Sequence, residues 1–212
     1  AGEFIAHFDD DDLYTPAYLN SMVMEMARSS ALGITLSSWY IVDTSTGTFG
    51  YCDPVIWGNM LDEPLSVMDH EVRSRLYGYG FSYVYRRDAA LEFPYKDVNL
   101  GEDYQFFTEL QRSKGNQCIA LLEDKYGICL HTQHQNNTSK AFAIWEVPLE
   151  SVSKLEFADF MPVFDTYLRH FPKIGVPSGG DSIYLLTDMK RTPHRRFRDL
   201  TVHAPAGRVE VR

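Results

Sequence analysis

Four consecutive aspartates, Asp9 to Asp12, follow directly on an apolar segment near the start of the chain. The segment Glu3 to Phe8 alternates weakly between polar and apolar residues and predicts a buried strand. Thr15 and Pro16 then predict the N-cap and first residue of a helix that runs to about Ser30. A strand, an acidic loop and a helix in this order form an α/β unit, so the aspartates are expected at the end of a strand.

The four adjacent carboxylates of this run repel one another and would raise one another's pKa. A bound divalent cation removes that repulsion, and hard oxygen ligands suit Mg²⁺ or Mn²⁺. These ions bind through one or two protein carboxylates and complete their shell with water and substrate phosphates. A solvated acidic turn, or an aspartate-rich cap of the following helix, is an equally good interpretation of the run taken alone.

The rest of the pattern alternates between β-rich and helical segments. Two β-rich segments, 34–42 and 48–52, flank the sequence Thr44-Ser45-Thr46-Gly47, which predicts a hairpin turn. Further strands are expected over 80–85, 118–122 and 126–130, and helices over 65–76, 102–113 and 155–171. Gly115 is expected to close the helix 102–113, and a Pro/Gly-rich loop is expected over 176–181.

A second pair of acids, Glu102 and Asp103, follows Gly101 at the start of the predicted helix 102–113. Taken alone, acids at this position are typical of a favourable interaction with the helix dipole. A catalytic carboxylate is the alternative interpretation.

The bulk properties limit the classes of partner. With 212 residues the chain suits one well-buried domain. A formal net charge of −9 argues against a nucleic-acid partner. The segment Met189 to Arg212 carries seven basic and two acidic residues, a net charge of +5, so the remainder carries −14. This basic tail is interpreted as a solvated segment, with a docking arm as the alternative.

The cysteines Cys52, Cys118 and Cys129 are odd in number and lack a CxxC spacing, which favours reduced thiols over a zinc site or a disulfide framework. No apolar stretch approaches the length of about 20 residues that a membrane-spanning helix needs. A cytoplasmic or an organellar compartment is compatible with both observations.

Three motifs in order give the chain a family resemblance. The passage from Glu3 through the aspartates to Tyr14 and Pro16 resembles the strand-DxD-helix passage of family 2 glycosyltransferases. The resemblance implies that Asp9 and Asp10 lie beside the nucleotide sugar. It also implies that Asp11 and Asp12 hold the metal, Mn²⁺ or Mg²⁺, that bridges the diphosphate.

The second motif comprises Tyr85-Arg86-Arg87, Phe93-Pro94 and Glu102-Asp103, which resemble the acceptor side of the same active site. By this resemblance Asp103 is the general base that removes a proton from the acceptor hydroxyl, and Glu102 is its neighbour and orienter. Arg86 and Arg87 are assigned to the nucleotide sugar.

The third motif is the spacing His134-x-x-Asn137-x-Ser139, which resembles a loop that follows the Glu-Asp helix in many members of the family. It implies a metal-ligand or phosphate-contacting role for His134. A lone histidine is more often a hydrogen-bonded structural residue, and we keep that interpretation for His131.

The resemblance implies an α/β domain of the GT-A fold, Rossmann-like, with a mixed and mostly parallel sheet flanked by helices. Residues 1–140 are expected to form its metal and acceptor half, 141–188 an extension of the same domain, and 189–212 the basic tail. The nucleotide-binding strands that open the family's domain lie outside this sequence, so a further segment or another subunit is expected to cover an exposed sheet edge.

The function implied is inverting, metal-dependent transfer of a sugar from a nucleotide-diphosphate sugar, most commonly a uridine diphosphate sugar, to a hydroxyl acceptor. Two alternatives stay open. The domain could be a non-catalytic structural subunit of a larger assembly, or a carbohydrate-binding module that needs neither metal nor nucleotide.

Overall fold

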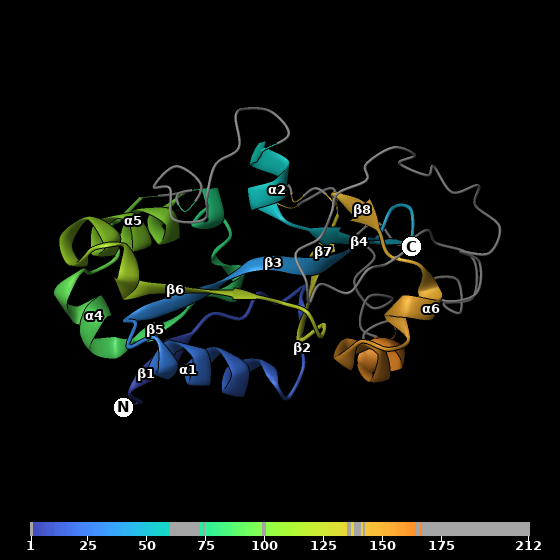
Figure 1. Cartoon of the computed structure of the whole chain (residues 1–212), viewed down its shortest axis with the longest axis horizontal. Coiled ribbons are helices and arrows are strands. Elements are labelled where there is room, and N and C mark those ends of the chain that lie inside the picture. The colour runs from blue at the N-terminus through green and yellow to red at the C-terminus, as the bar shows by residue number, and fades with distance from the viewer. Residues whose placement is uncertain are drawn as a thin grey trace. The chain divides into compact units, whose positions relative to one another are not determined.

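A computed structural model describes residues 2–59, 73, 75–98, 101–134, 137, 141, 143–163 and 166 (Figure 1). The chain divides into two compact units. The first unit comprises Ala1–Asp12, Pro16–Ser38 and Asp53–Asp124, and the second comprises Leu13–Thr15, Trp39–Cys52 and Lys125–Arg212. Each unit is described by itself below.

The sheet of the first unit has the strand order β1, β5, β3, β6. These strands are β1 (Phe4–Ala6), β5 (Val84–Arg86), the first half of β3 (Gly33–Asp43) and β6 (Ile119–Glu123). β1 and β3 both pair antiparallel with β5, whereas β3 and β6 are parallel. Within the described part of the chain β5 is the one strand that pairs with β1, so β1 forms an edge of this sheet.

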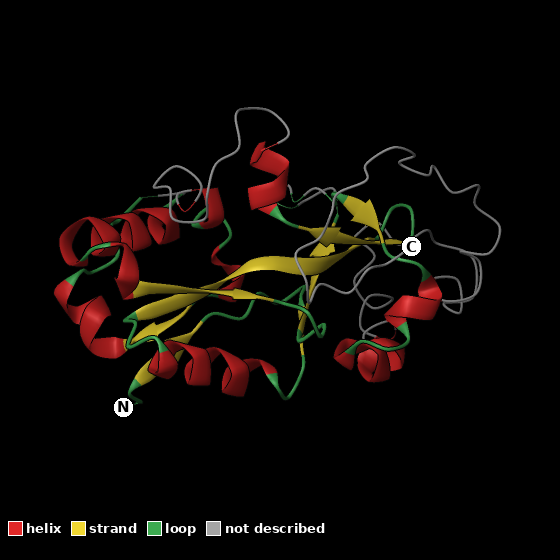
Figure 2. Ribbon diagram, viewed as in Figure 1, coloured by secondary structure: helices red, strands yellow, loops and turns green. Residues whose placement is uncertain are grey.

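Helices lie on both sides of these strands (Figure 2). They are α1 (Tyr18–Arg28), α2 (Pro54–Asn59), α4 (Arg87–Glu92) and α5 (Glu102–Lys114), with short 3₁₀ turns η1 (Gly80–Ser82) and η2 (Asn116–Cys118). α1 packs on β5 and β6 and buries Tyr18, Met22 and Met26, which recur every four residues on one helix face. α5 lies on the other side of the strands (Figure 1).

The core of the first unit is aromatic where α5 meets the sheet. Phe107 of α5 is fully buried and stacks on Tyr83, with ring centroids 3.8 Å apart and planes 9° apart. Gly33 of β3 makes room for this ring, because a Cβ atom at Gly33 would lie 3.0 Å from the Phe107 Cζ atom. The close approach of α5 therefore depends on a glycine in the neighbouring strand.

The second unit is built on a hairpin. Its strands are the second half of β3, β4 (Thr48–Cys52), β7 (Cys129–Gln133), β8 (Trp145–Glu146) and β2 (Leu13–Tyr14), followed by α6 (Leu149–Val152) and η3 (Glu156–Phe160). β3 and β4 pair antiparallel, and Gly47 adopts a positive φ of 69° in the turn between them. The predicted hairpin over 34–52 is confirmed.

The expectation of a mostly parallel sheet was wrong. Among the described strands five of the seven pairings are antiparallel, and only β3–β6 and β3–β7 are parallel. Parallel pairing requires a long crossover, and here it occurs only where long helical segments separate the strands in sequence. The structure is thus a mixed α/β arrangement with a mostly antiparallel sheet.

Two predicted boundaries were also wrong. The first helix begins at Tyr18 with Ala17 at the N-cap. Thr15 lies before the helix: its backbone N–H donates to the Ile128 carbonyl at 2.9 Å, and its hydroxyl donates to Glu156 Oε2 at 3.4 Å. The predicted strand 80–85 begins as the 3₁₀ turn η1, and the strand itself, β5, starts only at Val84.

Other expectations have mixed outcomes. The helix expected over 102–113 is confirmed as α5, with Gly115 at its C-cap. The helix expected over 155–171 begins as the 3₁₀ turn η3, and most of its second half lies outside the described residues. Most of the expected helix 65–76, the loop 176–181 and the tail 189–212 also lie outside them.

The three cysteines are buried thiols, as the sequence favoured. Burial raises the pKa of the Cys118 thiol to about 11. Over the described residues no helix has the length and apolar character needed to cross a membrane.

We expect Phe107→Ala to lower the free energy of unfolding by about 3–5 kcal/mol, because it removes the fully buried ring that stacks on Tyr83. Urea unfolding followed by circular dichroism measures the change. Leu91→Ala is the control, since Leu91 is 73% exposed on α4, and its effect is expected within about 0.5 kcal/mol. Equal losses in the two variants would contradict this account of the core.

Candidate active site

The aspartate run forms a turn directly after β1. The Asp12 backbone N–H donates to the Asp9 carbonyl at 3.5 Å, which folds the run back on itself. As a result, one carboxylate oxygen from each of Asp9, Asp11 and Asp12 lies within 4.8 Å of the others. Asp9 is exposed, and Asp11 and Asp12 are half-buried. Three carboxylate oxygens at this spacing form a donor set of the kind that Mg²⁺ and Mn²⁺ prefer.

The membership of this cluster differs in part from the prediction. Asp11 and Asp12, expected at the metal, are both members. Asp9, expected beside the nucleotide, joins them, whereas Asp10 is not a member. The difference follows from the turn, which brings its first and fourth residues together. A run of four identical residues gave no indication of which three carboxylates would lie together.

Glu102 and Asp103 occupy the first turn of α5. Gly101, the N-cap, has a positive φ of 79°, which lets the chain enter the helix abruptly. The Tyr104 backbone N–H donates to Asp103 Oδ1 at 2.6 Å. Both acids are half-buried, and the helix N-terminus stabilises their negative charge.

His7, the residue after β1, was not predicted as a site residue. Its backbone N–H donates to the Tyr83 carbonyl at 2.8 Å, which continues the pairing of β1 with β5. Its ring nitrogen Nε2 lies 3.1 Å from the Tyr85 hydroxyl and 3.3 Å from the Tyr95 hydroxyl. His7 is therefore held by a small polar network at the end of β1.

The charges of Glu102 and Asp103 act on this network. Burial lowers the pKa of the His7 imidazole, while a hydrogen bond to the Gly80 carbonyl and the charges of Asp103 and Glu102 oppose that shift. Burial raises the pKa of Tyr95, and the charges of Asp103 and Glu102 raise it further. Because His7 stands two residues before Asp9, the start of α5 and the aspartate turn lie at the same end of β1.

The sequence carried one signal for His7. His7 is the one ionisable side chain between Phe4 and Phe8, the stretch that leads into the aspartates, and a buried polar group requires partners. Tyr95 had no comparable signal, because its contacts with His7 join residues 88 positions apart.

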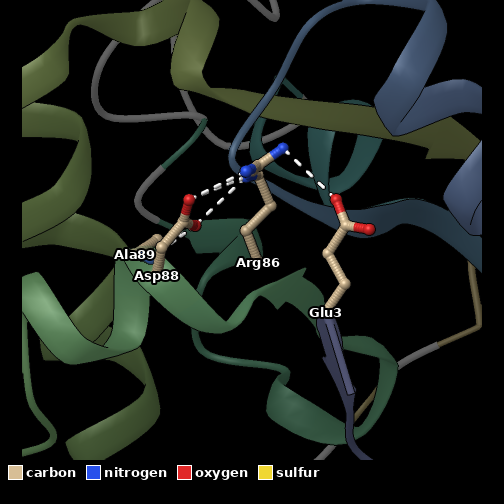
Figure 3. Close-up of polar contacts among 4 residues, drawn as sticks. All are labelled: Glu3, Arg86, Asp88 and Ala89. Carbon is tan, nitrogen blue, oxygen red and sulfur yellow. Dashed lines mark hydrogen bonds and ion pairs between the residues drawn. The ribbon is translucent and has the colours of Figure 1, made fainter. Parts of the chain in front are cut away.

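Arg86 and Arg87 lie at the other end of β1. Arg86 is opposite Phe4 in the strand register, three residues or about 10 Å from His7. The Arg86 guanidinium pairs with Asp88 at 2.8 Å and with Glu3 at 3.7 Å (Figure 3). Arg87 is exposed on α4. The structure does not bring these two arginines to the aspartate turn, and their assignment to the nucleotide sugar stays a prediction.

His134 belongs to the second unit. The Asn137 side chain accepts from the His134 backbone N–H at 2.5 Å and donates to the Thr132 carbonyl at 3.0 Å. Asn137 therefore fixes the backbone at His134. Ser139 lies outside the described residues, and the role of His134 as a metal ligand stays a prediction.

No protein-family model and no curated protein matches this chain. Its own side chains are therefore the basis on which a function can be assigned.

We expect Asp11→Asn to weaken Mn²⁺ binding at least tenfold, because it removes one carboxylate of the three-aspartate cluster. Isothermal titration calorimetry, or the electron paramagnetic resonance signal of free Mn²⁺, measures the affinity. Asp10→Asn is the matched control, since it changes the net charge equally at the adjacent position outside the cluster. Equal losses in both variants would indicate diffuse attraction by the acidic run instead of a defined site.

Proposed function

We propose that this chain carries the metal and acceptor half of an inverting glycosyltransferase active site of the GT-A type. The observation that carries the proposal is that the aspartate turn and the acids of α5 both lie near His7, at one end of β1. There the aspartate turn follows His7, and the charges of Glu102 and Asp103 act on the His7 ring. An isolated acidic turn needs no second acidic group beside it.

In the proposed reaction Asp9, Asp11 and Asp12 hold Mn²⁺ or Mg²⁺. When bound, the ion neutralises negative charge on the diphosphate of the sugar donor as it leaves. The three carboxylates fix the place of the diphosphate, and hence of the anomeric carbon, relative to the start of α5.

Asp103 is the proposed general base. Its carboxylate takes the proton of the acceptor hydroxyl while the hydroxyl oxygen forms a bond to the anomeric carbon and the bond from that carbon to the diphosphate oxygen breaks. The displacement occurs in one step from the face opposite the leaving group, so the configuration at the anomeric carbon inverts. Glu102, the adjacent acid, orients Asp103 or the acceptor.

The order of the elements supports the GT-A part of the proposal. Strand β1, the aspartate turn, α1 and the acids of α5 follow one another as the resemblance implies. The described part of the chain differs from the expected GT-A fold in its sheet, which is mostly antiparallel instead of mostly parallel.

The donor class follows from the same chemistry. A diphosphate bridged by a divalent ion is the group that an aspartate cluster of this kind recognises, and a uridine diphosphate sugar is the donor that the resemblance makes most common. We therefore take uridine diphosphate sugars as the first donors to test.

We expect Asp103→Asn to reduce turnover of the active donor by a factor of about 10²–10⁴, because the amide cannot accept the proton. Release of uridine diphosphate, with Mn²⁺ present and water or a panel of sugars as acceptor, measures turnover. Mn²⁺ affinity should stay within about twofold of the unsubstituted chain, since Asp103 is outside the aspartate cluster.

Asp97→Asn is the control, because Asp97 is an exposed acid of the same unit that belongs neither to the aspartate cluster nor to α5, and the turnover of this variant should be unchanged. If the unsubstituted chain neither binds uridine diphosphate with Mn²⁺ nor turns over any donor, the enzyme proposal is wrong. The non-catalytic subunit is then the better account.

A further inference from the structure

Gly80, the first residue of η1, lies directly against the Asp103 carboxyl group. A Cβ atom added to Gly80 would lie 2.0 Å from Asp103 Oδ2, 2.9 Å from its Cγ and 3.1 Å from its Cβ. The first two distances are shorter than non-bonded atoms tolerate. The Asp103 side chain therefore occupies the space that any larger residue at position 80 would fill.

The backbone of Gly80 does not itself require glycine. The described glycines with positive φ are Gly47, Gly101, Gly115 and Gly127, and Gly80 is not among them. An alanine can therefore adopt the conformation that position 80 has. The requirement for glycine at this position is a requirement for space beside Asp103.

The Gly80 backbone is also held in place from several sides. Its carbonyl accepts a hydrogen bond from the Tyr83 backbone N–H at 3.2 Å, and the Tyr83 carbonyl accepts one from the His7 backbone N–H at 2.8 Å. Two residues further on, the buried Ser82 hydroxyl lies 2.8 Å from Thr35 Oγ1 and accepts from the Leu36 backbone N–H at 3.1 Å. Because η1 is tied both to β3 and to the end of β1, it cannot easily move away from a new side chain.

From this geometry we propose that Gly80 is a positioning residue of the active site, which seats the Asp103 carboxylate at the distance from the aspartate turn that the reaction needs. The backbone links the two acidic groups. His7, which precedes the aspartate turn, donates its backbone N–H to the Tyr83 carbonyl, and the Tyr83 backbone N–H donates to the Gly80 carbonyl. Gly80 in turn lies against the Asp103 carboxyl group. The catalytic part of this inference rests on the proposed function, whereas the contact between Gly80 and the Asp103 carboxyl group is a property of the fold.

Gly80→Ala should therefore change the position of the Asp103 carboxylate without unfolding the protein. With η1 fixed, the carboxylate has to move by about 1 Å or more to restore an ordinary contact distance. A misplacement of about 1 Å can reduce turnover by about 10²-fold. Alanine costs less backbone entropy on folding than glycine, so a large loss of stability is not expected.

The experiment compares the unsubstituted chain with Gly80→Ala, Gly78→Ala, Asp103→Ala and the double variant Gly80→Ala/Asp103→Ala. Gly78→Ala is the matched control, because a Cβ at Gly78 would meet only the Arg75 carbonyl, at the ordinary distance of 3.5 Å. For each protein we would measure the melting temperature, kcat and KM for the donor, and determine crystal structures of both single glycine variants.

The expected result has three parts. Gly80→Ala displaces the Asp103 carboxylate by about 1 Å or more and lowers kcat at least tenfold, while KM for the donor stays within about twofold. Gly78→Ala changes neither quantity. In the Asp103→Ala background, Gly80→Ala has no further effect on kcat, since the two substitutions act through the same group.

Two results would overturn the inference. One is an Asp103 carboxylate in the same position in the Gly80→Ala and Gly78→Ala structures. The other is a loss of kcat on Gly80→Ala that persists in full in the Asp103→Ala background. If the unsubstituted chain has no turnover, the proposed function fails, and the position of the carboxylate in the crystal structures still decides whether Gly80 seats Asp103.

Discussion

The pairing of β1 with β5 determines where the chemistry of the first unit lies. Because Ala6 is opposite Val84, the next residue, His7, donates its backbone N–H to Tyr83 and meets the 3₁₀ turn that precedes β5. The same register places Arg86 beside Phe4, at the far end of the strand. A shift of one residue would reverse the faces of both strands and separate the aspartate turn from the acids of α5.

The negative charges of the two acidic groups at this end of β1 are compensated in different ways. The aspartate turn gathers three carboxylates whose mutual repulsion is relieved only by a cation or by water. The acids of α5 are instead stabilised by the helix N-terminus, and Asp103 also receives the Tyr104 backbone N–H. The first group is therefore suited to holding a metal ion, whereas the negative charge of the second is already balanced by the backbone of its own helix.

Local sequence signals predicted the elements that depend on neighbouring residues. The hairpin at Gly47 and the helix that ends at Gly115 were both predicted, since each is encoded by a turn or cap. Thr15 was misassigned as an N-cap, since its backbone N–H and its hydroxyl are directed to Ile128 and Glu156, far away in sequence. Periodicity likewise does not record the contacts that set strand direction, that add Asp9 to the aspartate cluster, and that form the His7 network.

The contact between Gly80 and Asp103 links two positions that are 23 residues apart. A larger residue at position 80 fits only if the side chain at position 103 becomes smaller or moves, so the substitutions tolerated at one position depend on the residue at the other. In a lineage that lost the acid at position 103, position 80 would no longer be restricted to glycine. Related sequences that keep glycine at 80 together with aspartate at 103 are thus expected to keep the Asp103 carboxylate in the same position.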